Sequence, residues 1–251
     1  MFWWTILTTS VSASSPDDVS QWLLAQPTPP GQLTEMSRIG LSEDYAQHFT
    51  RWVRQQLAQH AAVAVLAFRD GTCDESSQLQ VLSPGFPSLG TSAPIKHFEG
   101  SVFRLETTGC LAIADLSLAE QTYNSAAFRT TEMPNLADLR SQGDQLCLRS
   151  NRVPGVVSAT DFCLTSSRYQ DTGLTVTHNA LSINNTDSGA APVYYREEVI
   201  IFAQLSERVG LYRMIWTRGE EIGMAGKTIL QRTASSSQSR VYRALEEWSQ
   251  Q

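Results

Sequence analysis

The residues with the clearest chemistry in this 251-residue sequence are four cysteines: Cys73, Cys110, Cys147 and Cys163. No two of them form a C-x-x-C pair, so the usual zinc and thioredoxin spacings are missing. A turn signal, Val153-Pro154-Gly155-Val156, lies between the last two, and Cys147 and Cys163 each stand eight residues from Gly155. An antiparallel hairpin centred on Gly155 places these two cysteines opposite each other, within reach of a disulfide.

The remaining two cysteines, Cys73 and Cys110, are then available for a second disulfide. Disulfides persist in oxidising compartments, so the cysteines favour an exported protein, periplasmic or secreted. The start of the chain agrees, because an apolar stretch runs into Val11-Ser12-Ala13, the small-x-small pattern of a signal-peptidase site. We expect residues 1–13 to be a signal peptide, although no Lys or Arg precedes the short apolar stretch. The alternative is a cytoplasmic protein with four reduced, buried cysteines.

Catalytic and cofactor motifs are missing from the sequence. It contains no G-x-S-x-G elbow, no H-E-x-x-H pair and no Asp-rich calcium loop. Gly226-Lys227-Thr228 looks like the end of a P-loop, but Glu221 stands where that motif needs its first glycine. We therefore expect no catalytic residues, no metal and no cofactor. An unrecognised hydrolase is the alternative, and it would need His97 or His178 beside a carboxylate and a nucleophile.

The most suggestive polar and aromatic residues lie in two neighbouring segments, 194–202 and 211–218. The first begins Tyr194-Tyr195-Arg196-Glu197-Glu198, and the second contains alternating polar and apolar residues. Alternation along a strand puts Tyr212, Met214 and Trp216 on one face and Arg213 on the other. An aromatic and methionine face beside arginine suits a ligand cavity, so we predict ligand contacts from four residues: Tyr195, Tyr212, Met214 and Trp216. The alternative is the ordinary core of a sheet.

The first part of the chain is mainly helical in pattern. Apolar spacing predicts a helix over 17–26, a stiff linker over 27–31 and a long amphipathic helix over 42–60 with Ser42 as its N-cap. An unbroken apolar run over 62–68 ends at Asp70-Gly71 and is typical of a buried strand. The Pro- and Gly-containing stretch 83–94 is the best candidate for a boundary.

The second part of the chain reads as an antiparallel sheet flanked by helices. Val102 to Thr107 alternates as a strand, Ser117 begins a capping-box helix that runs through Phe128, and 135–141 adds a short helix. Further strands are expected over 145–150, 158–166, 173–183, 193–205, 209–218 and 227–233, and a closing helix over 237–248. We divide the chain into a signal peptide (1–13), a mainly helical region with a strand pair (14–98) and an antiparallel α+β domain (99–251).

This order of elements resembles the helix-grip arrangement of START-like lipid-transfer and polyketide-cyclase domains. The resemblance covers about 150 residues and is one of topology. It implies a curved antiparallel sheet that wraps a C-terminal helix around an apolar cavity, here with an N-terminal helical extension. It implies no particular binding residues in this chain.

Composition narrows the function further. The formal charge of −6 and the pI near 5.2, without a basic block, argue against a nucleic-acid partner. No apolar run approaches the ~18 residues of a membrane span. We expect an exported, non-enzymatic domain that binds a hydrophobic small molecule or lipid-like amphipath in the cavity of a curved sheet. An envelope interaction or assembly module without a ligand is the main alternative.

Overall fold

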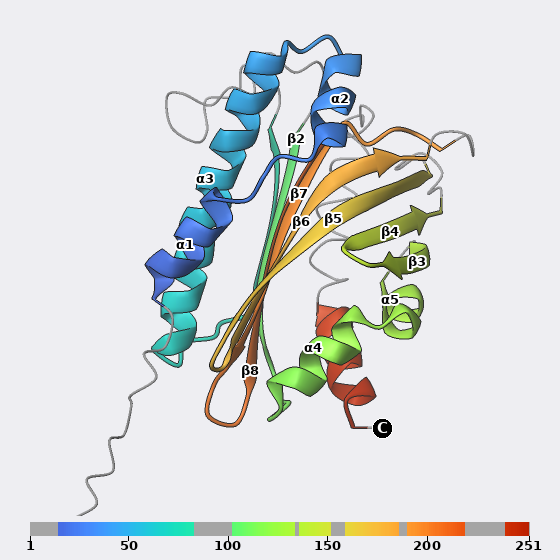
Figure 1. The fold of residues 1–251 in the computed structure, drawn as a ribbon. Helices are drawn as coiled ribbons and strands as arrows, with labels where there is room; N and C mark the ends of the chain where they lie inside the picture. Colours follow the sequence, from blue (N-terminus) through green and yellow to red (C-terminus); the bar gives the residue numbers. More distant parts are fainter. Residues whose placement is uncertain are drawn as a thin grey trace, which may run out of the picture.

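One antiparallel sheet organises the chain. The computed structural model describes residues 15–82, 102–133, 136–151, 159–185, 190–218 and 239–250. Eight strands pair in the order β1-β2-β8-β7-β6-β5-β4-β3 (Figure 1). Their bounds are β1 (Ser76–Leu82), β2 (Val102–Leu111), β3 (Leu136–Gln142), β4 (Gln145–Ser150), β5 (Thr160–Asp171), β6 (Leu174–Asn184), β7 (Tyr195–Gln204) and β8 (Val209–Arg218). The predicted α+β class with a curved antiparallel sheet is confirmed.

Helices precede, interrupt and follow the sheet. Their bounds are α1 (Pro16–Leu24), α2 (Pro30–Arg38), α3 (Glu43–Arg69), α4 (Leu116–Asn124) and α5 (Ala126–Glu132), and a last helix covers 239–248. Ser15 caps α1 in a complete capping box with Asp18. Ser42 caps α3 as predicted, with its side chain accepting a hydrogen bond from the Tyr45 amide.

Different helices cover the two faces of the sheet (Figure 1). We call the side under α1–α3 the N-terminal face. There, a Cβ added to Gly210 of β8 would lie 2.6 Å from the Phe68 ring of α3. We call the other side, which meets α4, α5 and the 239–248 helix, the C-terminal face. There, a Cβ added to Gly109 of β2 would lie 1.9 Å from the Tyr242 ring. Glycine lets the strands approach a covering helix closely on both sides.

Residues 62–68 form the last turns of α3, and the predicted strand there is wrong. Ala61, Ala64, Val65 and Phe68 are buried at helical spacing, whereas Val63 is 68% exposed. The apolar run therefore has an outer face, and its alanines favour a helix. The helix ends in a Schellman motif, because Gly71 has φ +72° and the Thr72 amide donates to the Ala67 carbonyl at 2.8 Å.

The predicted helix over 135–141 is also wrong, because residues 136–141 belong to the edge strand β3. Gly143, with φ +62°, allows a tight turn into β4, and Leu139 packs opposite Leu148. Pairing with β4 and burial of the leucine override the local helical pattern. This strand adds to the sheet an edge that the sequence pattern did not predict.

Two helix starts differ from the sequence-based expectation. The linker expected over 27–31 is shorter, because α2 begins at Pro30, a residue suited to the first helical position. The helix expected from Ser117 begins earlier, since Asp115 is the N-cap and accepts from the Leu118 amide at 3.1 Å. The sequence pattern thus missed α2 altogether, and the helix expected to run through Phe128 is interrupted at Ser125, which ends α4 and caps α5.

The strand pair expected within residues 14–98 is only partly seen. The described residues of that region hold one strand, β1, and it pairs with β2. Several predictions lie outside the described residues: the 1–13 signal peptide, the 83–94 loop, the boundary at 98, the turn at Pro154-Gly155 and the strand over 227–233. Within the described part of the chain, no helix is long and apolar enough to cross a membrane.

Candidate functional site

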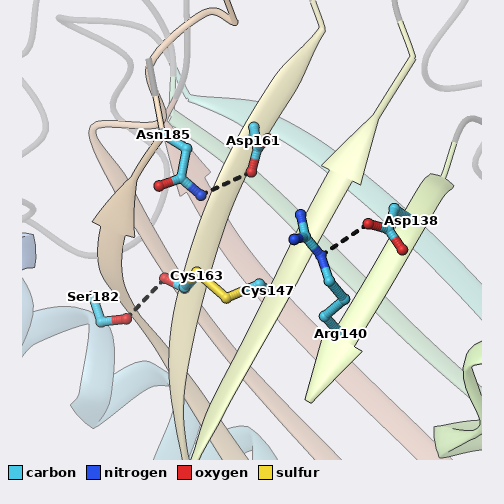
Figure 2. The surroundings of a disulfide bond; sticks show 7 residues. All are labelled: Asp138, Arg140, Cys147, Asp161, Cys163, Ser182 and Asn185. Atoms are coloured by element: carbon cyan, nitrogen blue, oxygen red, sulfur yellow. Dashed lines mark hydrogen bonds and ion pairs between the residues drawn. A yellow bond between two sulfur atoms is a disulfide. The ribbon is translucent and has the colours of Figure 1, made fainter. Parts of the chain in front are cut away.

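The disulfide between Cys147 and Cys163 joins β4 to β5 (Figure 2). The two residues are direct cross-strand partners, as the predicted register requires, with Cα atoms 3.9 Å apart. Beside them, the Ser182 hydroxyl of β6 donates to the Cys163 carbonyl at 3.0 Å. The bond therefore fixes the register between β4 and β5, next to the edge strand β3.

The second disulfide joins Cys73 to Cys110, the pair that remained after the hairpin argument. Cys73 follows the C-terminus of α3, and Cys110 lies near the end of β2. This bond ties the N-terminal helical layer to the sheet near its other edge. Both bonds thus hold strands or layers together, and neither leaves a free thiol among the described residues.

The four residues predicted to contact a ligand all lie on the N-terminal face, in the core beneath α3. Tyr195, Met214 and Trp216 are 0% exposed and Tyr212 is 2% exposed. Trp52 of α3 meets the Trp216 ring edge-on at 5.2 Å between centroids. This packing matches the alternative interpretation of the face as sheet core. Their role as ligand contacts stays a prediction.

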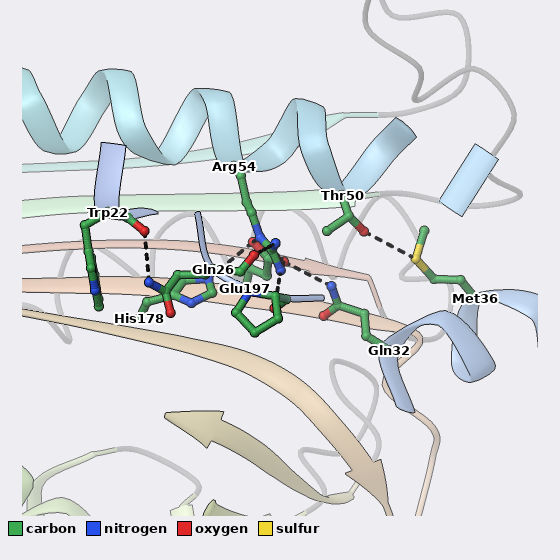
Figure 3. A network of polar contacts seen from close by, with 9 residues as sticks. Trp22, Gln26, Gln32, Met36, Thr50, Arg54, His178 and Glu197 are labelled. Carbon is green, nitrogen blue, oxygen red and sulfur yellow. Dashed lines mark hydrogen bonds and ion pairs between the residues drawn. The ribbon is translucent and has the colours of Figure 1, made fainter. Parts of the chain in front are cut away.

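Beneath α3, a closed ion-pair cluster forms around Glu197 of β7 (Figure 3). Its carboxylate accepts from Arg54 of α3 at 3.0 Å and from the Gln32 amide of α2 at 3.1 Å. His178 Nε2 of β6 lies 3.4 Å from the same carboxylate. Arg54 also donates to the backbone carbonyls of Gln26 and Pro27, between α1 and α2. One buried carboxylate thereby holds three helices on the sheet.

The surroundings of Glu197 favour its ionised form. Burial raises the pKa of Glu197, but the hydrogen bond from His178 and the charge of Arg54 outweigh it, so the pKa lies below its usual value. Burial, followed by the Glu197 charge, raises the pKa of Tyr195 well above its ordinary value. Glu197 therefore stays charged under α3, and its charge adds to the effect of burial on Tyr195.

The hydrolase alternative required a histidine beside a carboxylate and a nucleophile. His178 does lie beside Glu197, but it is 2% exposed beneath the helices, and no described Ser, Thr or Cys side chain hydrogen-bonds to it. His97 lies outside the described residues. The described part of the chain also holds no cluster of His, Cys, Asp or Glu able to bind a metal ion.

A second group of charges on the N-terminal face surrounds Glu106 of β2. Its carboxylate accepts from Arg104, from the Tyr212 hydroxyl at 3.0 Å and meets His60 Nδ1 at 2.9 Å. Burial raises the pKa of Glu106, but bonds from His60 and Arg104 lower it to about 2. This group anchors the middle of α3 to the sheet, as the Glu197 cluster does nearer the start of that helix.

The C-terminal face carries a different charged cluster, around Glu198. This carboxylate is 0% exposed and pairs with Arg213 of β8 and, at 3.7 Å, with Arg196 of β7. Arg129 of α5 is 2% exposed and is the third nearby arginine charge. Burial raises the pKa of Glu198, but the three arginines lower it to about 2. Asn179 of β6 is the direct cross-strand neighbour of Glu198.

Apolar side chains surround the Glu198 cluster. Tyr123 and Phe128 come from the two short helices, Ile200 and Phe202 from β7, and Leu245 from the 239–248 helix. The guanidinium of Arg129 lies over the Tyr123 ring at 5.6 Å. The guanidinium of Arg196 lies over the Phe162 ring at 5.4 Å. The alternation along β8 predicted that Arg213 lies on the face of the sheet opposite to that of Tyr212. No signal in the sequence indicated that Arg129 lies near Arg213.

The structure also has a pocket of about 340 Å³ between α5 and the 239–248 helix. Four of its six lining residues are charged: Glu132, Arg240, Arg243 and Glu247. Arg240 faces Glu132 at 3.8 Å and is largely exposed. This polar hollow does not suit the apolar part of the expected ligand.

No family model and no curated protein matches this chain. Among solved structures, a STAR-related lipid transfer protein fragment from Xanthomonas axonopodis is similar, with 13% identity, 60% of this chain and 93% of that chain covered, and a TM-score of 0.46. Human STARD10 has 11% identity over 74% of this chain and 80% of that chain, with a TM-score of 0.46. A START superfamily protein from Mycobacterium smegmatis has 12% identity over 59% and 97%, with a TM-score of 0.42.

Proposed function

We propose that this protein is an exported, non-enzymatic binding domain for an apolar or amphipathic ligand. The ligand would lie at the C-terminal face of the sheet, beside β7, β8 and the 239–248 helix. The observation that carries the proposal is the charged cluster around Glu198, which is set in an apolar layer. An amphipath has the matching chemistry, an apolar body with a polar end.

A purely structural layer would not need these charges. Buried arginines are costly unless each is paired, and hydrophobic residues of similar volume usually serve a core equally well. On the N-terminal face the buried arginine is paired, because Arg54 forms an ion pair with Glu197. On the C-terminal face three arginines share one carboxylate, an arrangement that supports a binding role over a packing role.

The proposal of export rests on the two disulfides. Both join residues distant in sequence, 37 and 16 positions apart, and structural disulfides persist mainly outside the reducing cytoplasm. Fractionation of the source cells, followed by thiol labelling without reductant, tests this directly. We expect the protein in an oxidising compartment with no reactive thiol, and reduced cysteines in the cytoplasm would contradict export.

Native mass spectrometry tests ligand binding. We expect the purified protein to carry a noncovalent adduct that organic extraction removes. Adding the extract back should restore the adduct and slow amide hydrogen exchange in β7, β8 and the 239–248 helix. Protection confined to α3 would instead place the ligand at Tyr195, Tyr212, Met214 and Trp216.

Two neighbouring residues of β7 supply matched variants. Ile200→Phe enlarges a side chain on the C-terminal face, whereas Val199→Phe enlarges one on the N-terminal face. Val199→Phe adds four side-chain carbons and Ile200→Phe adds three, so the control overpacks its core at least as much, but only Ile200→Phe should lower ligand occupancy. If native mass spectrometry gives the mass of the protein alone, both before extraction and after the extract is added back, the proposal is contradicted. That result would favour an assembly module.

A further inference from the structure

The charges at the C-terminal face do not balance. Glu198 faces Arg129, Arg196 and Arg213, three cations against one anion. The other buried acids on the described part of this face have partners of their own: Glu120 pairs with Arg168 at 2.7 Å. The cluster therefore holds a surplus of two positive charges in an apolar layer.

Arg213 hydrogen-bonds to Glu198 directly, whereas Arg196 forms only a 3.7 Å ion pair with it, so the donors of Arg196 and Arg129 are the less well satisfied ones. Within the described part of the chain, three polar atoms of the cluster are buried without a hydrogen-bond partner: Nε of Arg129, Nε of Arg196 and Oε2 of Glu198, which lies 3.7 Å from Arg196. Burial of these guanidiniums lowers the pKa of both arginines, which reflects the cost of keeping them charged there. An anion would supply the missing acceptors and the missing charge together.

Ring stacking leaves the donors of both arginines available. Arg129 lies over the Tyr123 ring at 5.6 Å and Arg196 over the Phe162 ring at 5.4 Å, and a ring contact of this kind takes up no hydrogen-bond acceptor. The N–H groups of a guanidinium lie in its plane, and this planar fork matches carboxylate and phosphate oxygens. The rings thus orient the two arginines as an anion cradle.

Solvent reaches one side of the cluster. The side chain of Arg196 is 16% exposed and that of Arg213 is 21% exposed, whereas Arg129 lies deeper at 2%. A ligand would therefore meet Arg196 first and Arg129 last. Because Arg129 lies deep, we expect inorganic anions alone to bind poorly, since they bring no apolar group to replace water in the layer.

We propose that Arg129 and Arg196 bind the anionic end, carboxylate or phosphate, of the ligand held at the C-terminal face. This inference rests on the proposed function, since the apolar layer must hold the rest of the ligand. It assigns a charge to the ligand class, which the proposed function leaves open. Glu198 would position Arg213 and Arg196 and would not touch the anion.

Calorimetric titration with three probes tests the proposal at pH 7: dodecyl phosphate, dodecanol and inorganic phosphate. We expect the full chain to bind dodecyl phosphate at least about tenfold more tightly than dodecanol. Arg129→Met should bring this ratio close to one while the Kd for dodecanol changes less than about twofold. Arg196→Met should act in the same direction, and Arg149→Met, at an exposed arginine of β4, should leave the ratio unchanged.

Near-UV circular dichroism of each variant shows whether the fold is retained. Equal affinity of the wild-type chain for dodecyl phosphate and dodecanol would overturn the anion site but leave the proposed function standing. Tight binding of inorganic phosphate, lost in Arg129→Met, would support the anion site and overturn the amphipathic ligand. Failure of all three probes to bind would overturn both.

Discussion

Two adjacent glutamates of β7 show how differently the two faces of the sheet use buried charge. Glu197 points to the N-terminal face, where Arg54, His178 and Gln32 complete its contacts (Figure 3). Glu198 points to the C-terminal face, where three arginines surround it. Both carboxylates are 0% exposed. Burial is therefore equal on the two faces, and the number of opposing cations is what distinguishes them.

We interpret the Glu197 cluster as a contact that holds helices on the sheet, and the Glu198 cluster as part of a binding surface. A cluster whose members satisfy one another has little to gain from a ligand, because every donor already has an acceptor. A cluster with surplus donors gains stability when an anion arrives, by the ordinary linkage of binding to folding. A buried glutamate thus has a structural role on the N-terminal face, and on the C-terminal face it belongs to the proposed binding site.

Matched arginine substitutions give the largest expected difference between the faces. Arg54→Met leaves Glu197 buried without its cation and should lower the free energy of unfolding by about 3–5 kcal/mol. Arg129→Met removes a surplus charge and should change stability by less than about 1 kcal/mol, since the relief offsets the lost ring contact. Urea unfolding of the unliganded proteins measures both, and equal losses would remove the distinction between the two clusters.

Removal of each disulfide compares the two edges of the sheet. The Cys73–Cys110 bond closes the longer loop, so its double alanine variant should lose about 4 kcal/mol, against about 3 kcal/mol for Cys147–Cys163, on the loop-entropy account. Only the first loss should also speed hydrogen exchange in α3, because only that bond holds the helical layer. Guanidinium unfolding checks the order, and a larger loss at Cys147–Cys163 would reverse it.

Acidification should weaken the Glu198 cluster. Its pKa is lowered from 4.5 to about 2, so its contribution is complete above pH 4.5 and is lost as the pH falls toward 2. The lowered pKa corresponds to roughly 3 kcal/mol of stability at neutral pH. Unfolding measured from pH 6 to pH 2 should therefore show a shallower decline in Glu198→Gln than in the wild-type chain. Parallel curves would mean that Glu198 titrates normally.

Alanine substitutions at two glycines should have the smallest effects, and they compare the helices that cover the two faces. Gly109→Ala pushes a methyl group against Tyr242, and Gly210→Ala pushes one against Phe68. Each should cost about 1–3 kcal/mol by overpacking. Hydrogen exchange should rise in the 239–248 helix for the first variant and in α3 for the second. Loosening of both helices by either variant would show that the two faces are not independent layers.

Much of the framework was predictable from local patterns. The hairpin register that pairs Cys147 with Cys163 follows from a central turn and equal flanks, and α3 follows from its cap and apolar spacing. The pattern failed at 62–68, where an apolar run is compatible with either a strand or a helix. The alanines and the exposed positions of Val63 and Leu66 decide it, and exposure is a tertiary property.

The candidate site was only half predictable. Alternation separated Tyr212 from Arg213, but a period of two does not say which helices cover which face. Arg129, on a short helix 69 positions earlier in the chain, lies close enough to act electrostatically on Glu198, and no local pattern records that proximity. Contacts between residues that are distant in the sequence depend on the spatial order of the eight strands and on which helices cover each face. Local patterns in the sequence do not give that order.

The adjacency of Glu197 and Glu198 has a consequence for how the sheet assembles. A slip of β7 by one residue would move both carboxylates to the opposite faces, and in one of the two directions it would bring Arg196 to the place of Glu197, opposite Arg54. Two cations would then meet in an apolar layer, and such a pairing costs several kcal/mol. The neighbouring charges of β7 therefore disfavour that misaligned register of the sheet.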